Sequence, residues 1–165
     1  AKKRSALTAA QQSLREGSWK KEYLVGVFGH PTFEKKEIRL ALSKNICEEK
    51  TRKVFVDEQN GQFALSRFTV KQRLNLGSLM TARILTGRTH QIRVHAAALG
   101  LPVVGDERYG DFVQNKALRI KRMLLHAHLL SLPHPATGIS LSLHCPIPQN
   151  FSIELEKLGK VVLAQ

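Results

Sequence analysis

The sequence predicts a single α+β domain, spanning residues 1–165, in which a mostly antiparallel sheet is flanked by helices. Segments of strand composition follow one another from residue 19 to residue 86 with only short turns between them. Helix-like segments stand before and after this run and do not alternate regularly with strands, which argues against a doubly wound fold. The 165 residues are 42% hydrophobic, which is enough for one domain with a buried core.

The first half of the chain begins with a predicted amphipathic helix over residues 3–16. Leu7, Ala10 and Leu14 recur there at helical spacing, and Gly17 ends the pattern. Segments of strand composition follow at residues 19–28, 36–42, 52–57, 62–73 and 78–86. Asn60-Gly61 stands between the third and the fourth of them, and this dipeptide predicts that those two strands pair as a hairpin.

The second half is predicted to contain further helices and a hairpin. The first helix covers residues 89–99, with Thr89 as its N-cap and Gly100 at its C-terminal end. The other predicted elements are a short helix at 111–121, paired strands at 124–132 and 139–144 joined by a turn at 133–138, and a closing helix at 150–159.

The charge of the chain indicates a polyanionic partner. It has 26 Lys and Arg residues against 13 Asp and Glu residues, which gives a formal net charge of +13. Lys and Arg bind nucleic acid by releasing counterions from its phosphates, so nucleic acid is the leading candidate. An acidic membrane surface is the rival partner, but the sequence contains no basic amphipathic helix with a bulky aromatic face.

Neither membrane insertion nor a disulfide framework is indicated. The longest nearly apolar stretch, residues 96–105, contains Pro102 and is much shorter than a bilayer-spanning helix. The N-terminal residues lack the apolar segment of a signal peptide. Cys47 and Cys145 are far apart without a CxxC pair, so we expect two reduced packing residues in a cytoplasmic protein.

Residues 85–95, Leu-Thr-Gly-Arg-Thr-His-Gln-Ile-Arg-Val-His, carry the most informative pattern. They are typical of a strand end, a tight turn and a helix start, where exposed backbone amides favour a phosphate. Arg88, Thr89 and His90 cluster at that end, and Arg93 lies one helical turn beyond His90. A basic cluster of this kind, taken alone, is equally typical of a solvated helix end. The segment contains neither a P-loop nor a zincin pattern.

Together with Gly105-Asp-Glu-Arg-Tyr-Gly110, this segment closely resembles the third conserved motif of the RluA/RluC-type RNA pseudouridine synthases. Three other segments resemble motifs of that family in the same order, namely Lys21-Glu22-Tyr23-Leu24, Leu125-His126-Ala127 with Leu130, and His134-Pro135-x-Thr137-Gly138. The resemblance runs from about residue 1 to residue 159. Within the family, Leu42-x-Lys44-Asn45 looks nearest to the member that modifies large-subunit ribosomal RNA.

The resemblance implies an enzyme that breaks the N1–C1′ bond of a uridine in structured RNA, turns the base and rejoins it through C5. It implies no cofactor and no metal. Tyr23 would stack on the flipped uracil and take the C5 proton, and Arg93 would pair with the catalytic aspartate. The substrate-binding residues that the resemblance implies are Lys21, Arg88, Thr89 and His90, with Ile92 and Leu130 as apolar walls.

The nucleophilic aspartate of the family is not found in this sequence. In the family it lies in His-Arg-Leu-Asp-x-x-Thr-Ser-Gly, and Asp57, Asp106 and Asp111 have no such context. We therefore expect the chain to be the C-terminal major part of a catalytic domain, beginning just after that loop and without an upstream S4-like domain. We expect it to be inactive by itself, and we expect Asp106 to order a turn in its own loop.

Two alternatives to a ribosomal RNA synthase stay open. One is a sibling synthase acting on tRNA, and the other is a non-catalytic RNA-binding protein, which the net charge alone would suit equally well. Tyr23 together with residues 85–110 favours the enzyme, since a plain binder has no need of both. His126 and His128 alternate along a strand and could bind a metal, but a structural or RNA-facing role is favoured. We expect a monomer.

Overall fold

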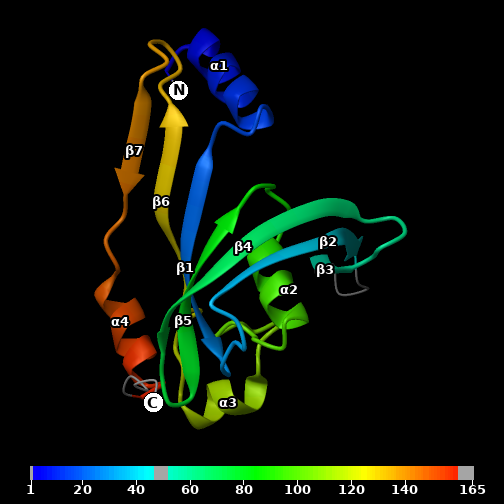
Figure 1. The fold of residues 1–165 in the computed structure, drawn as a ribbon, viewed down its shortest axis with the longest axis vertical. Coiled ribbons are helices and arrows are strands. Elements are labelled where there is room, and N and C mark those ends of the chain that lie inside the picture. The colour runs from blue at the N-terminus through cyan, green and yellow to red at the C-terminus, as the bar shows by residue number, and fades with distance from the viewer. Residues whose placement is uncertain (1, 47–51, 160–165) are drawn as a thin grey trace.

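The computed structural model describes residues 2–46 and 52–159, and seven strands of this part of the chain form one sheet (Figure 1). The strand order is β3-β2-β4-β5-β1-β6-β7, and every neighbouring pair is antiparallel. The strands are β1 Lys20–Phe28, β2 Lys35–Ile46, β3 Arg52–Val56, β4 Gln62–Arg73, β5 Gly77–Ile84, β6 Leu125–Pro133 and β7 Ser140–His144. The helices are α1 Arg4–Arg15, α2 Gln91–Ala98, α3 Phe112–Ala117 and α4 Gln149–Glu156. The predicted α+β class with an antiparallel sheet is confirmed.

The C-terminal half of β1 is buried on both faces of the sheet. Leu24 and Phe28 pack in a cluster with Phe151 of α4. Val25 and Val27, which alternate with them, pack in the cluster that contains the apolar side chains of α2. Figure 1 shows α2 and α4 on opposite sides of β1. Because both faces are covered, the strand has an unbroken apolar run instead of an apolar and polar alternation.

The register of β1 changes beside Tyr23. Glu22 faces Leu129 of β6, whereas Tyr23 faces Ala127, so an irregularity of the bulge type separates the two residues. A β-bulge bends the strand and re-aims the side chains next to it. The irregularity lies where β1 leaves the buried core, so Tyr23 is half-buried while the residues directly after it are buried.

The hairpin predicted at Asn60-Gly61 is wrong, because β3 and β4 do not pair with each other. Both pair with β2, and Leu42 of β2 faces Val56 on one side and Gln62 on the other. The turn between β3 and β4 therefore passes over β2 from one of its edges to the other. A Cβ on Gly61 would lie 2.6 Å from the backbone nitrogen of Leu42, so this glycine permits the close crossing.

The helix predicted at residues 89–99 forms, but Thr89 is not its N-cap. The N-cap is His90, in the left-handed region at φ 54°, and the helix begins at Gln91. Asn, Asp and His adopt this conformation more readily than other non-glycine residues. The predicted end is confirmed, since Gly100 follows the helix at φ +71°.

Helix α3 is shorter than the predicted 111–121. Asp111 caps its start by accepting a hydrogen bond of 2.9 Å from the backbone amide of Gln114. Arg119 has φ 51° after the helix, and the amide of Ile120 donates to the carbonyl of Asn115 at 2.9 Å. These two features make a Schellman end, which terminates the helix with no glycine in the sequence to signal it.

No helix in the described part of the chain is long and apolar enough to cross a membrane.

Candidate active site

Tyr23 lies between two pockets. The first, which we call the tyrosine pocket, has a volume of about 290 Å³ and is walled by Tyr23, Ile92 and Arg93 among others. The second, which we call the apolar groove, has a volume of about 380 Å³ and runs from Tyr23 past Lys21 to Leu130 and the end of β7. A tyrosine ring between two hollows presents both an apolar face and a hydroxyl to whatever fills them. No hydrogen bond of the Tyr23 hydroxyl is found among residues 2–46 and 52–159.

The turn that carries the basic cluster is held by Gln91. The amide nitrogen of this buried side chain donates at 2.9 Å to the carbonyl of Leu65 and at 2.9 Å to the hydroxyl of Ser66. Its amide oxygen accepts from the hydroxyl of Thr86 at 2.7 Å and from the backbone of Arg88 at 2.9 Å. The amide group of Gln91 thus makes two hydrogen bonds as a donor and two as an acceptor, and these bonds join the turn to β4.

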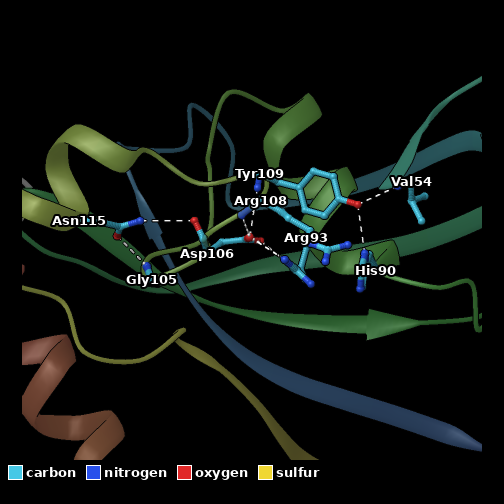
Figure 2. A network of polar contacts seen from close by, with 8 residues as sticks. All are labelled: Val54, His90, Arg93, Gly105, Asp106, Arg108, Tyr109 and Asn115. Atoms are coloured by element: carbon cyan, nitrogen blue, oxygen red, sulfur yellow. Dashed lines mark hydrogen bonds and ion pairs between the residues drawn. The ribbon is translucent and has the colours of Figure 1, made fainter. Parts of the chain in front are cut away.

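His90 faces the hydroxyl of Tyr109, as Figure 2 shows. The Tyr109 hydroxyl accepts a hydrogen bond of 2.8 Å from the backbone amide of Val54 and lies 3.0 Å from Nδ1 of His90. Burial and the charges of Arg93 and Arg108 lower the pKa of His90, in agreement with a neutral ring.

Arg93 is bound to Asp106 through two parallel hydrogen bonds, as Figure 2 shows. Its Nε donates to Oδ2 and its Nη2 to Oδ1, both at 2.7 Å. The guanidinium also lies over the ring of Tyr109, 4.9 Å from its centroid. The described residues therefore give Arg93 the carboxylate of Asp106 as its partner, whereas the resemblance implied the nucleophilic aspartate.

Asp106 is fully buried and also orders its own loop, as expected from the sequence. Its Oδ1 accepts from the backbone amides of Arg108 at 2.8 Å and Tyr109 at 3.1 Å. Burial raises the pKa of Asp106, but the hydrogen bonds from Arg93 and from these two amides outweigh it and lower the pKa overall. The hydrogen bonds to Asp106 raise the pKa of Arg93 in turn. Both partners are therefore charged.

The two glycines of Gly105-Asp-Glu-Arg-Tyr-Gly110 are required because backbone carbonyl groups lie too close to both positions for a side chain. Gly105 has φ +75°, and a Cβ on it would lie 2.1 Å from the carbonyl oxygen of Arg122. A Cβ on Gly110 would lie 2.1 Å from the carbonyl oxygen of Asp106. Any larger residue at either position would push the loop away, and with it the carboxylate that holds Arg93.

The structure brings most of the predicted site residues together, but not all of them. Those that line the tyrosine pocket are Tyr23, Arg88, His90, Ile92 and Arg93. Lys21 and Leu130 line the apolar groove instead, on the other side of the Tyr23 ring. Thr89 lines a third pocket, of about 340 Å³, together with Ser43 and Lys44. The predicted residues thus lie in three hollows, two of which Tyr23 lines, while Arg88 lines both the tyrosine pocket and the hollow of Thr89.

Arg88 is held by local hydrogen bonds, and Lys21 lies near the same turn. Arg88 donates from Nε to the carbonyl of Phe63 and from Nη1 to the side chain of Gln62, each at 3.0 Å. The amine of Lys21 approaches Gly87, since a Cβ on that glycine would lie 3.6 Å from it, and burial lowers the pKa of Lys21. Arg88 is therefore fixed at the turn before α2, and the amine of Lys21 lies close to that turn.

Sequence reasoning missed Tyr109, Gln91 and Met123 as parts of the site. Tyr109 and Gln91 lie within the recognised motifs, so a closer interpretation of those motifs could have found them. Met123 lines the tyrosine pocket from a segment with no motif, and no signal in the sequence marks it.

The histidines of β6 contact the segment after β7. Nδ1 of His128 lies 3.0 Å from the carbonyl oxygen of Cys145, and its Nε2 lies 3.1 Å from Nε2 of His144. His126 lies 3.3 Å from the same carbonyl oxygen. No group of three or more metal-ligating side chains is found in the described ranges. Cys145 is a free and exposed thiol, so the prediction that it packs in the interior is wrong; Cys47 lies outside the described residues.

Comparison with known proteins agrees with the motifs. The sequence pattern of the RNA pseudouridylate synthase family matches residues 1–98. The ribosomal large subunit pseudouridine synthase C of Escherichia coli K12 is 37% identical over 163 residues, covering 96% of this chain and 51% of that protein. The protein of the same name from Haemophilus ducreyi is 38% identical over 161 residues, covering 96% of this chain and 50% of that protein. The chain thus spans about half the length of these relatives.

Two solved human structures have a similar fold. RNA pseudouridylate synthase domain containing 1 has a TM-score of 0.76 and 30% identity, covering 88% of this chain and 62% of that one. RNA pseudouridylate synthase domain containing 4 has a TM-score of 0.75 and 22% identity, covering 99% of this chain and 70% of that one, a likeness of fold alone. With the family pattern matched over more than half of the sequence, the chain belongs to the RNA pseudouridylate synthase family.

Proposed function

We propose that this chain carries the uridine-binding part of a pseudouridine synthase that acts on large-subunit ribosomal RNA. The single observation that carries the proposal is the tyrosine pocket, which Tyr23 lines together with Arg93, whose side chain is held by Asp106. A target base must leave its stack to reach a pocket of this kind, where an aromatic face and apolar walls can hold it. The likeness to the ribosomal large subunit synthases supports ribosomal RNA over tRNA as the substrate.

The reaction is an isomerisation that needs a proton to move. The N1–C1′ bond of uridine breaks and a C5–C1′ bond forms, C5 loses its hydrogen as a proton, and N1 gains one. We assign the stacking of the uracil and the acceptance of the C5 proton to Tyr23. Ile92 forms the apolar wall of the pocket, and Leu130 continues that wall in the groove behind Tyr23.

The basic residues around the pocket are assigned to the RNA backbone. Lys21, Arg88 and His90 surround the turn before α2, and Thr89 faces the adjoining pocket beside Lys44. Because Nδ1 of His90 faces Tyr109, Nε2 is the ring nitrogen that remains to meet a phosphate or a base edge.

The nucleophile comes from outside these 165 residues. Asp106 is engaged by Arg93 and two backbone amides, and Asp57 and Asp111 cap a turn and a helix. None of the three stands in the Arg-Leu-Asp context of the family. The chain by itself is therefore inactive, and a reactive aspartate has to be placed opposite Tyr23 by another segment. We further propose that the enzyme is a cytoplasmic monomer.

The test compares three samples incubated with unmodified large-subunit ribosomal RNA. One contains this chain alone, and the second contains it joined to the part of the E. coli relative that the match leaves uncovered. The third is the second with the aspartate of its Arg-Leu-Asp motif changed to Asn. Pseudouridine, mapped by chemical probing, is expected in the second sample only. Modification by the chain alone would contradict the assignment of the nucleophile, and RNA binding without modification in any sample would favour the non-catalytic RNA-binding protein.

A further inference from the structure

We infer that a second RNA subsite lies beside the tyrosine pocket and holds the phosphodiester and an unpaired base next to the target uridine. The subsite is a cavity of about 520 Å³ between the loop at residues 105–111, α3 and residues 120–123. We call it the basic cavity. The inference rests on the proposed function, since it takes RNA as the ligand.

The charge of the basic cavity matches a phosphate backbone. Lys116, Lys121 and Arg122 line it, against the carboxylate of Glu107. Arg93 lines it as well, but Asp106 balances that charge. A site with several cations and one anion attracts a phosphodiester and releases counterions on binding it.

An aromatic ring stands at the rim with no partner in the core. Phe112 begins α3, is 59% exposed, and belongs to none of the buried clusters of the described residues. Its neighbour Val113 is 80% exposed. Aromatic side chains beside basic groups are the composition of sites that bind single-stranded nucleic acid, because every base offers a face for stacking. This feature favours RNA with an unpaired base over a free phosphate ion or an acidic protein.

The walls of the cavity are already ordered. Asn115 of α3 accepts a hydrogen bond of 2.7 Å from the amide of Gly105 and donates to the carbonyl of Asp106, as Figure 2 shows. On the opposite wall, Arg122 lies over the ring of Phe151, 5.7 Å from its centroid, and donates to the side chain of Asn150. A site that is ordered before binding loses less conformational freedom when the RNA arrives.

The two hollows share walls. Arg93 and Met123 line both the tyrosine pocket and the basic cavity. A strand whose uridine enters the tyrosine pocket therefore continues directly into the basic cavity, where the next phosphate meets the cations and the next base reaches Phe112.

The test measures binding of a fluorescent RNA hairpin, with uridine in its loop, to the 165-residue chain by anisotropy as a function of salt. The double variant Lys116→Gln/Lys121→Gln is compared with Lys35→Gln/Lys36→Gln, which removes the same charge from exposed positions on β2. The cavity variant is expected to bind about tenfold more weakly at about 0.1 M salt, with the slope of log Kd against log salt reduced by about 1 to 2. The β2 variant is expected to change the slope by less than half as much.

Phe112→Leu separates stacking from charge. It is expected to weaken binding by about fivefold or more while leaving the salt slope as in the unmodified chain. Thermal melting of each variant checks that the fold is intact. If the unmodified chain binds RNA but both cavity variants behave like the β2 control, the basic cavity is not a subsite and the proposed function stands. If the unmodified chain does not bind RNA, the proposed function fails together with the subsite.

Discussion

Arg93 and Asp106 form a bidentate ion pair in which the carboxylate is fully buried and the guanidinium side chain is 15% exposed. The pair joins α2 to the loop at residues 105–110, and it places Arg93 on the wall shared by the tyrosine pocket and the basic cavity. Parallel hydrogen bonds between a planar guanidinium and a carboxylate define orientation as well as distance. The position of Arg93 is therefore determined by a residue that does not itself line the tyrosine pocket.

Changing Asp106 to Asn should destabilise the fold. The substitution keeps the shape of the side chain but removes the charge, so Arg93 is left largely buried without a counter-ion. Breaking one side of such a pair costs about 3 kcal/mol in the free energy of unfolding, measurable by urea titration. Asp111→Asn is the matched control, since Asn is as good an N-cap as Asp and should change that free energy little. Equal stability of the two variants would show that the ion pair contributes nothing to folding.

Replacing Arg93 should reduce catalysis in the assembled enzyme, and Arg93→Ala should cost more than Arg93→Lys. Lysine keeps the charge but cannot make the two parallel bonds to Asp106 that arginine makes. Single-turnover rates and RNA affinity are to be measured separately for both variants. We expect the rate to fall by more than the loss of affinity explains; a change in affinity alone would identify Arg93 as a phosphate contact.

Tyr23→Phe should retain RNA binding and lose turnover in the assembled enzyme. The ring to which we assign the stacking of the base is preserved, while the hydroxyl to which we assign the C5 proton is gone. General acid–base groups contribute about 10²- to 10⁴-fold to a rate, and release of tritium from uridine labelled at C5 reports the step. Tyr109→Phe is the comparison: it removes a hydroxyl that contacts Val54 and His90 but does not line the tyrosine pocket, so it should alter RNA affinity and leave the release of tritium from bound RNA unchanged. Turnover close to that of the unmodified enzyme would remove Tyr23 from the proton transfer.

Stability should fall with acidification because of His95. This side chain is fully buried, neither ring nitrogen has a hydrogen-bond partner among the described residues, and burial lowers its pKa from 6.5 to about 4. The unfolded chain then binds the proton more readily than the folded chain between these two values. The stabilisation is complete above pH 6.5 and is lost as pH falls toward about 4, by up to about 3 kcal/mol in the free energy of unfolding.

The measurement is a series of urea titrations across that pH range for the unmodified chain and for His95→Leu. The leucine variant has no group to protonate, so its free energy of unfolding should vary less with pH in this window. Identical pH dependence of the two proteins would show that another group controls the acid response.

Local chemistry determined where most elements lie. The strand predicted at residues 62–73 is β4, Gln62–Arg73. Its apolar and β-branched residues favour an extended backbone, and any adjacent strand can satisfy the hydrogen-bonding groups of that backbone. The motif at residues 85–95 likewise identified the turn and helix that carry Arg88, His90 and Arg93. These features depend on neighbours in sequence, so the sequence was sufficient to predict them.

The tertiary structure decided what the same segments contact. Asn60-Gly61 has the composition of a two-stranded hairpin, but it connects β3 to β4 across β2, because pairing both strands with β2 satisfies more backbone groups than a hairpin alone. Asp106 and Arg93 are 13 residues apart, and only the closure of the loop on Gly105 and Gly110 brings them to 2.7 Å. Pairings of this kind depend on how distant segments close around a common core, and such closure has no periodic or local signature in the sequence.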